Sequence, residues 1–194
     1  MKNQVKISGK RISNLEFSYA AWNQKFYFFQ IAVERKSKKL DCIWVMIPDN
    51  LIIFLPKVGE YATVKGSLRS SKRTAHGRYL FANEITKEEV EKNENKVSVH
   101  GIVVSDPHYG QKKDGREITT VIIACNRRNG NPAYIPIVAW GRNAAILKKS
   151  QRGDMVGGIG RYLERPYLKD GMLFTTYEAS LDVVRIERSN NRGC

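Results

Sequence analysis

The sequence repeats itself, and this repeat constrains the fold more than any other feature. Three segments of the first half recur in the second half at a constant spacing of 92 residues, and a pair of glycines recurs at a spacing of 94 residues. The matches are residues 5–9 with 97–101, 29–35 with 121–127, 43–47 with 135–139, and Gly59 and Gly66 with Gly153 and Gly160. Four matches in the same order indicate two copies of one domain.

A polar stretch over residues 86–95, the most acidic part of the chain, separates the two copies. We therefore expect a first domain over residues 1–85, a linker over residues 86–95, a second domain over residues 96–188 and a short tail over residues 189–194.

Apolar residues within each copy recur with a period of two, which is typical of β-strands. Tyr134 and Trp140, for example, share one phase of a strand, and Ile137 lies on the other. Only residues 50–57 and 142–149 look helical, each between the third and fourth expected strands. Five strands in this order are typical of the oligonucleotide-binding (OB) fold. The sequence predicts an all-β protein with one short helix per copy, built from two tandem OB-fold five-stranded barrels.

The chain is strongly basic, with a net charge of +14 and a pI of about 9.8. Residues 1–92 carry 17 basic and 9 acidic side chains, or +8, and residues 93–194 carry 16 and 10, or +6. A polyanion, and nucleic acid first, is the partner that such a balance favours, although a surplus of lysine can also serve solubility alone.

Other function classes find little support. No apolar run reaches the roughly 18 residues of a membrane span, and no secretory signal stands at the N-terminus, so we expect a cytoplasmic protein without a membrane partner. Cys42, Cys125 and Cys194 are far apart and odd in number, which favours reduced thiols over a metal site. The glycine-rich residues 153–160 lack a P-loop lysine, and the histidines have no ligand-spaced partners. We expect no enzyme activity, cofactor, metal or small-molecule substrate.

Five segments of the second copy carry a resemblance to a known family, namely residues 96–107, 124–127, 137–145, 147–153 and 160–167. Through these segments the second copy resembles the bacterial single-stranded DNA-binding protein family, and the first copy is similar more weakly over residues 31–35, 64–68 and 81–85. The resemblance implies sequence-independent binding and protection of single-stranded DNA in replication, recombination or repair. Members of this family assemble four single-domain chains, so two fused copies imply a homodimer with four OB domains.

Base stacking on aromatic side chains is the binding mode that the resemblance implies, at Tyr134, Trp140 and Tyr167. The residues themselves support it, because Tyr134 and Trp140 are six positions apart and an extended strand puts both on one face about 20 Å apart. Burial of Trp140 in the core is the alternative.

The first copy departs from this pattern, because Cys42 and Pro48 stand at the positions that match Tyr134 and Trp140. Trp44 lies on the same strand phase, and Trp22 and Phe28 lie in the 1–2 loop and the second strand. Either the base platforms have moved to these aromatics, or the aromatics form a core or an interface between the copies.

Basic residues cluster in the loops and strand ends that flank the expected binding faces, as a groove that tracks a phosphate backbone requires. The candidates are Lys112, Lys113, Arg116, Arg127, Arg128, Arg161 and Arg165 in the second copy, and Lys72 and Arg73 in the first.

The printed sequence stops at Cys194 without the acidic, hydrophobic tip that usually ends members of this family. We therefore expect a specialised plasmid, phage or mobile-element protein rather than a housekeeping one. A primosomal accessory protein and an RNA-binding OB-fold protein are the alternatives.

Overall fold

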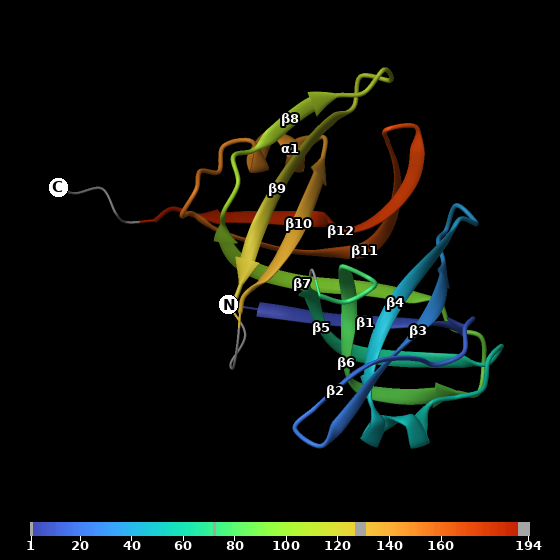
Figure 1. Ribbon diagram of the computed structural model, residues 1–194. Helices are drawn as coiled ribbons and strands as arrows, with labels where there is room; N and C mark the ends of the chain where they lie inside the picture. Colours follow the sequence, from blue (N-terminus) through green and yellow to red (C-terminus); the bar gives the residue numbers. More distant parts are fainter. Residues whose placement is uncertain (1, 72, 127–130, 190–194) are drawn as a thin grey trace. The chain divides into compact units, whose positions relative to one another are not determined.

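Each copy of the repeat folds into a closed five-stranded barrel in the computed structural model, which describes residues 2–71, 73–126 and 131–189 (Figure 1). The barrel strands of the first copy are β1 (Lys2–Arg11), β3 (Gln24–Glu34), β4 (Leu40–Pro48), β5 (Tyr61–Ser70) and β6 (Arg78–Glu88). Those of the second copy are β7 (Glu94–Val103), β9 (Glu117–Cys125), β10 (Ala133–Trp140), β11 (Met155–Lys169) and β12 (Met172–Glu187).

The first strand closes each barrel by pairing with two partners. In the first copy β1 pairs antiparallel with β5 along most of its length and with β3 at Lys10 and Arg11. In the second copy β7 pairs with β11 and, at Ile102 and Val103, with β9. The third and fifth strands pair in parallel in both copies, β4 with β6 and β10 with β12. This is the strand order of an OB-fold, so the predicted fold class is confirmed.

A short extra strand in each copy was not predicted from the sequence. β2 (Glu16–Ala21) pairs with β3, and β8 (His108–Gln111) pairs with β9, so the 1–2 loop of each barrel is a β-hairpin arm (Figure 1).

The two expected helices lie between the third and fourth barrel strands, as predicted. In the second copy this segment is the α-helix α1 (Arg142–Leu147). In the first copy it is the 3-10 helix η1 (Asp49–Phe54), which ends because Leu55 precedes Pro56 and adopts an extended conformation.

Repeated glycines perform the same task in both copies. A Cβ atom on Gly9 would lie 2.2 Å from the carbonyl oxygen of Ala32, and one on Gly101 would lie 2.6 Å from that of Ala124. Both glycines therefore let the first strand approach the second strand closely enough to close the barrel.

Alternate side chains of the strands fill the barrel interiors. Fully buried apolar side chains include Ile7, Phe29, Ile31, Ile43, Val45 and Val64 in the first copy and Val97, Ile123, Ile137, Ala139, Leu147 and Val156 in the second. None of the helices in these described ranges is long and apolar enough to cross a membrane.

The chain packs into two compact units that do not follow one cut at the linker. One unit contains Gln4–Lys96 and Leu163–Tyr177, and the other contains the described residues of 1–3, 97–162 and 178–189. β6 runs to Glu88 and β7 begins at Glu94, so residues 89–93 join the two barrels. The outer part of the β11–β12 hairpin, Leu163–Tyr177, belongs to the unit formed by the first copy.

Candidate nucleic-acid interface

The third strand of the second barrel presents two aromatic rings on its outer face. Ile135, Ile137 and Ala139 of β10 are buried in the barrel. Tyr134 and Trp140 lie on the opposite phase, where Tyr134 is 48% exposed and Trp140 is half-buried. The strand phase predicted for these two residues is therefore observed, and both rings lie on a surface that unpaired bases can reach.

A cation lies beside the Trp140 ring. The guanidinium carbon of Arg116 is 5.3 Å from the centroid of that ring. Arg116 Nε also donates a hydrogen bond of 2.8 Å to Asp114 Oδ2, and this bond holds the pKa of the Asp114 carboxyl below its ordinary value. A stacking ring with an adjacent guanidinium offers a base and its phosphate one contact each.

The β8–β9 arm carries further cations. Lys112 and Lys113 are exposed in the turn of this arm. At the base of the arm, Lys148 Nζ lies 3.7 Å from the centroid of the Tyr109 ring. Arg161 is exposed on β11, 3.5 Å from a carboxylate oxygen of Asp182. Arg127 and Arg128, which we also predicted here, lie outside the described residues.

Tyr167, the third predicted platform, lies in the other unit. It belongs to the hairpin segment Leu163–Tyr177, which packs with the first copy. Its ring is 42% exposed and stacks on Phe174, with ring centroids 5.7 Å apart. Arg165 lies on the same strand and is half-buried. The sequence analysis missed Phe174, although its place opposite Tyr167 across the turn at Asp170 and Gly171 could have indicated it.

An aromatic cluster covers the corresponding outer face of the first barrel. Its buried members are Phe26, Phe28, Met46 and Tyr79, and Trp44, Phe81 and Ala21 pack against them. Phe28, which we predicted as a nucleic-acid contact, is 2% exposed and belongs to this cluster. The rings of Trp44, His76 and Tyr79 meet the Phe28 ring nearly at right angles. Phe28 cannot stack on a base without unpacking, so we correct that prediction and assign Phe28 to the core.

Trp44 is half-buried and already has an aromatic partner. The imidazole of His76, from the turn between β5 and β6, stacks on its indole with ring centroids 3.5 Å apart. The sequence indicates only that His76, like the other histidines, has no partner at the spacing of a metal site. No local pattern links it to Trp44, because the two residues meet only when β4 and β6 pair.

Two further predicted residues of the first copy lie at turns. Trp22 is 97% exposed at the tip of the β2–β3 arm, where it and Asn23 adopt φ of 48° and 56°. Two consecutive residues with positive φ are typical of a two-residue hairpin turn. Arg73 is exposed in the β5–β6 turn, and Lys72 lies outside the described residues.

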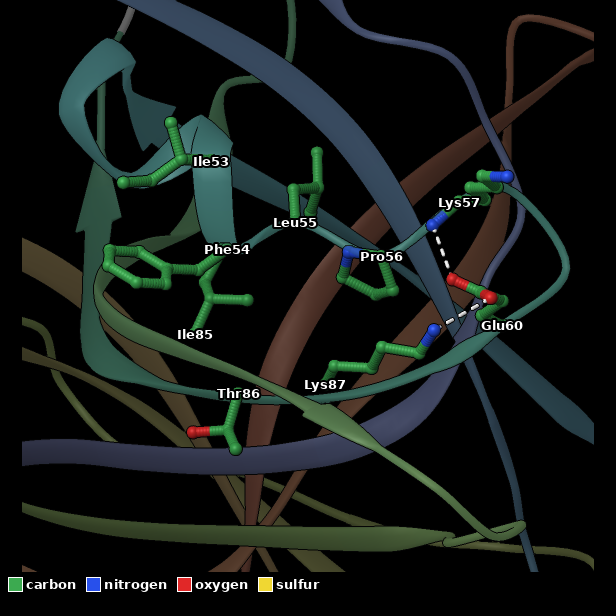
Figure 2. A pocket seen from close by; sticks show the side chains of 9 residues that line it. All are labelled: Ile53, Phe54, Leu55, Pro56, Lys57, Glu60, Ile85, Thr86 and Lys87. Atoms are coloured by element: carbon green, nitrogen blue, oxygen red, sulfur yellow. Dashed lines mark hydrogen bonds and ion pairs between the residues drawn. The ribbon is translucent and has the colours of Figure 1, made fainter.

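A pocket of about 580 Å³ lies near η1, away from these rings (Figure 2). Its wall is largely apolar, with Phe54 and Pro56 among the lining residues. Figure 2 shows the Glu60 carboxylate between the backbone nitrogen of Lys57 and the ammonium of Lys87, at 2.7 and 2.9 Å. None of the described residues that line this pocket is a predicted nucleic-acid contact, so we do not include the pocket in the nucleic-acid interface.

Among the described residues, no group of three or more histidine, cysteine or acidic side chains could hold a metal ion. Cys125 is buried, and burial raises the pKa of its thiol to about 11, so this thiol stays protonated near neutral pH.

Comparison with known proteins gives a family match for the second copy and a fold for both copies. The model of the single-strand binding protein family matches residues 94–186. The structure aligns over 100% of its length, with a TM-score of 0.74, with the wild-type single-stranded DNA-binding protein from Thermus aquaticus, covering 95% of that chain at 18% identity. A deletion mutant of the Thermus aquaticus protein aligns equally well, with 97% of its chain covered at 17% identity.

These alignments span both barrels, so the likeness extends to the tandem arrangement of two OB-folds in one chain. The dimeric N-terminal domain of PriB protein from Thermoanaerobacter tencongensis is 30% identical over 45% of this chain and 98% of its own, but its TM-score of 0.42 is too low to support an argument. No curated protein matches the chain by sequence.

Proposed function

Because residues 94–186 match the single-strand binding protein family, we propose that the chain binds single-stranded DNA with little sequence preference and protects it during replication, recombination or repair. The observation that supports this proposal best is the outer face of β10. Tyr134 and Trp140 share that face, and Arg116 lies beside the Trp140 ring. Stacking accepts any base, and it requires bases that are not paired.

Charge supports the same function. A net charge of +14 supplies the cations that a phosphate backbone attracts, and exposed lysines on the β8–β9 arm extend them beyond the stacking rings. We place this binding activity in the cytoplasm, with DNA as its main partner and no small-molecule substrate.

The choice between DNA and RNA is tested by competition. A labelled oligothymidylate bound to the protein is displaced with unlabelled poly(dT) or poly(U). We expect poly(dT) to compete at lower concentration, and stronger competition by poly(U) would favour an RNA-binding OB-fold protein. Membership of a plasmid, phage, mobile-element or primosomal class stays a prediction.

We further propose that the working unit is a homodimer with four OB barrels. Two chains of 22.1 kDa give about 44 kDa, which light scattering measures directly. A mass near that of one chain in dilute solution would contradict the dimer and leave the binding proposal untouched.

A further inference from the structure

The β11–β12 hairpin extends well beyond the length of its counterpart in the first copy. β11 and β12 contain 15 and 16 residues, whereas β5 and β6 contain 10 and 11. The outer part of this hairpin, Leu163–Tyr177, packs in the unit of the first copy. The second copy of the repeat therefore contributes a structural element to the first barrel.

The hairpin is fixed at Asp41 and Cys42, at the beginning of β4. The backbone N–H of Glu164 donates to Asp41 Oδ1 at 2.9 Å, and the backbone N–H of Cys42 donates to Glu164 Oε2 at 2.8 Å. Across the hairpin, the Tyr177 hydroxyl donates to the carbonyl oxygen of Cys42 at 2.7 Å. Both backbone groups of Cys42 are thus satisfied by the hairpin.

These contacts occupy an edge that the first barrel leaves open. β4 pairs with β6 at Val45 and Met46, and among the described residues no strand pairs with the earlier part of β4 on that side. Asp41 is buried there, and its carboxylate is compensated by Arg35, which also donates to the carbonyl oxygen of Glu164 at 3.2 Å. A buried, charge-assisted contact of this kind fixes the hairpin in one orientation.

Tyr177 strengthens the attachment. The residue is buried, and burial together with the neighbouring Glu164 carboxylate raises the pKa of its hydroxyl, which stays a hydrogen-bond donor at physiological pH. Beside it, Arg78 Nη1 of β6 donates to Thr176 Oγ1 at 2.7 Å.

The attached hairpin carries an exposed aromatic pair beyond its anchors. Tyr167 and Phe174 are 42% and 39% exposed, and their planes are inclined by 27°. The anchor residue Cys42 is the counterpart of Tyr134 in the first copy, because it stands 92 positions earlier and 92 residues is the spacing of the repeat. The hairpin is therefore attached where the first barrel lacks the platform that the second barrel has.

We propose that this hairpin supplies the first barrel with a base-stacking platform, with Tyr167 and Phe174 as the stacking rings and Glu164 and Tyr177 as the residues that position them. The inference rests on the proposed single-strand binding. It assigns the rings to the first barrel, and it adds Phe174 to the site. Arg165, two residues before Tyr167, supplies a cation to the same strand.

The full-length chain is tested with a labelled oligothymidylate long enough to span both barrels. We expect Tyr167→Ala and Phe174→Ala each to weaken binding by about 5- to 150-fold, the effect of one lost stacking contact. Leu173→Ala is the matched control, because this exposed apolar side chain on the same hairpin has no ring, and we expect its affinity to be unchanged. Unchanged affinity in both aromatic variants would overturn the proposal.

Positioning is tested by a double-mutant cycle. In a Glu164→Ala/Tyr177→Phe background, we expect Tyr167→Ala to have little further effect on affinity, because the ring is no longer held at the first barrel. The same fold-loss in both backgrounds would overturn the role of the first copy. Thermal melts verify folding, and if the double background does not fold, Tyr177→Phe alone, which removes one hydroxyl, takes its place.

Failure of this inference is distinguishable from failure of the proposed function. If the wild-type chain prefers single strands and Trp140→Ala weakens binding while Tyr167→Ala and Phe174→Ala do not, only the inference about the hairpin is wrong. If the wild-type chain shows no such preference, the proposed function is wrong.

Discussion

The imidazole of His76 stacks on the indole of Trp44, with ring centroids 3.5 Å apart and planes inclined by 14°. His76 Nε2 also lies 3.3 Å from Glu16 Oε2 of the β2 strand, and the edge of Phe28 meets the imidazole at a centroid distance of 4.7 Å. The imidazole of His76 thus covers one face of the Trp44 indole.

Removal of this ring gives the first prediction. We expect His76→Ala to tighten binding of single-stranded DNA, because a base can then stack on the uncovered indole without displacing the histidine. Fluorescence anisotropy with an oligothymidylate measures the change. The double variant with Trp44→Ala is the control and should show no gain, and weaker binding by His76→Ala alone would mean that the imidazole itself contacts the strand.

Trp22 gives the second prediction, since its side chain is almost free of contacts at 97% exposure. We expect Trp22→Ala to leave the melting temperature unchanged and to weaken single-strand binding by about 5-fold or more, the lower range for one stacking contact. Ile53→Ala is a matched control, because Ile53 is 81% exposed on η1, outside the proposed interface. Equal affinities of the two variants would remove Trp22 from the interface.

The third prediction concerns the second barrel. Trp140→Ala should weaken binding by about 5- to 150-fold while the barrel stays folded, because the ring lies on the outer face of β10 and the interior is filled by the opposite phase. Circular dichroism and a binding titration on the same sample separate the two effects. Loss of the folded signal would assign Trp140 to the core.

Asp154 gives a prediction on acid stability. Its buried carboxylate accepts hydrogen bonds from the backbone N–H of Gln151 at 2.9 Å and of Ser189 at 3.2 Å, and from Arg188 Nη1 at 3.0 Å. Burial alone would raise the pKa of Asp154, but these bonds and the charge of Arg188 outweigh it and hold the pKa below its ordinary value.

Because the pKa of Asp154 is lower in the folded state than in the unfolded state, its carboxylate stabilises the fold at pH values above the unfolded pKa of about 3.9. This stabilisation is lost as the pH falls through the pKa of the folded state. We expect Asp154→Asn to lower the free energy of unfolding at pH 7 by about 1–3 kcal/mol. Denaturant titrations from neutral pH to pH 2 should show a smaller acid-dependent loss in the variant. Asp106→Asn, which alters an exposed pair with Arg152, is the control, and an effect as large as that of Asp154→Asn would contradict this account.

The repeat and the strand order were predictable because they depend on local signals. Alternating apolar residues indicate strands, and Gly9 and Gly101 occupy matching positions because each closes its barrel at the same point. The helical segment of the first copy was predicted between the correct strands but over residues 50–57, whereas the 3-10 helix ends at Phe54 because Leu55 precedes Pro56.

The errors and omissions have a common cause in long-range packing. In a strand with one buried face, buried and exposed side chains alternate. Phe26, Phe28 and Phe29 are all buried, because the aromatic cluster covers the outer face of the strand as well. The docking of Leu163–Tyr177 on the first copy joins residues such as Cys42 and Tyr177, 135 positions apart, and no spacing in the sequence indicates that contact.

The most direct test of the central claim is a titration of the full-length chain with single-stranded and duplex DNA of equal length at several salt concentrations. We predict tighter binding to the single strand, with about 4 to 6 phosphates neutralised and an affinity that falls by about 50- to 350-fold between 50 and 200 mM salt. Equal affinity for the two forms at matched length and salt would contradict the account, because base stacking on Tyr134 and Trp140 requires unpaired bases.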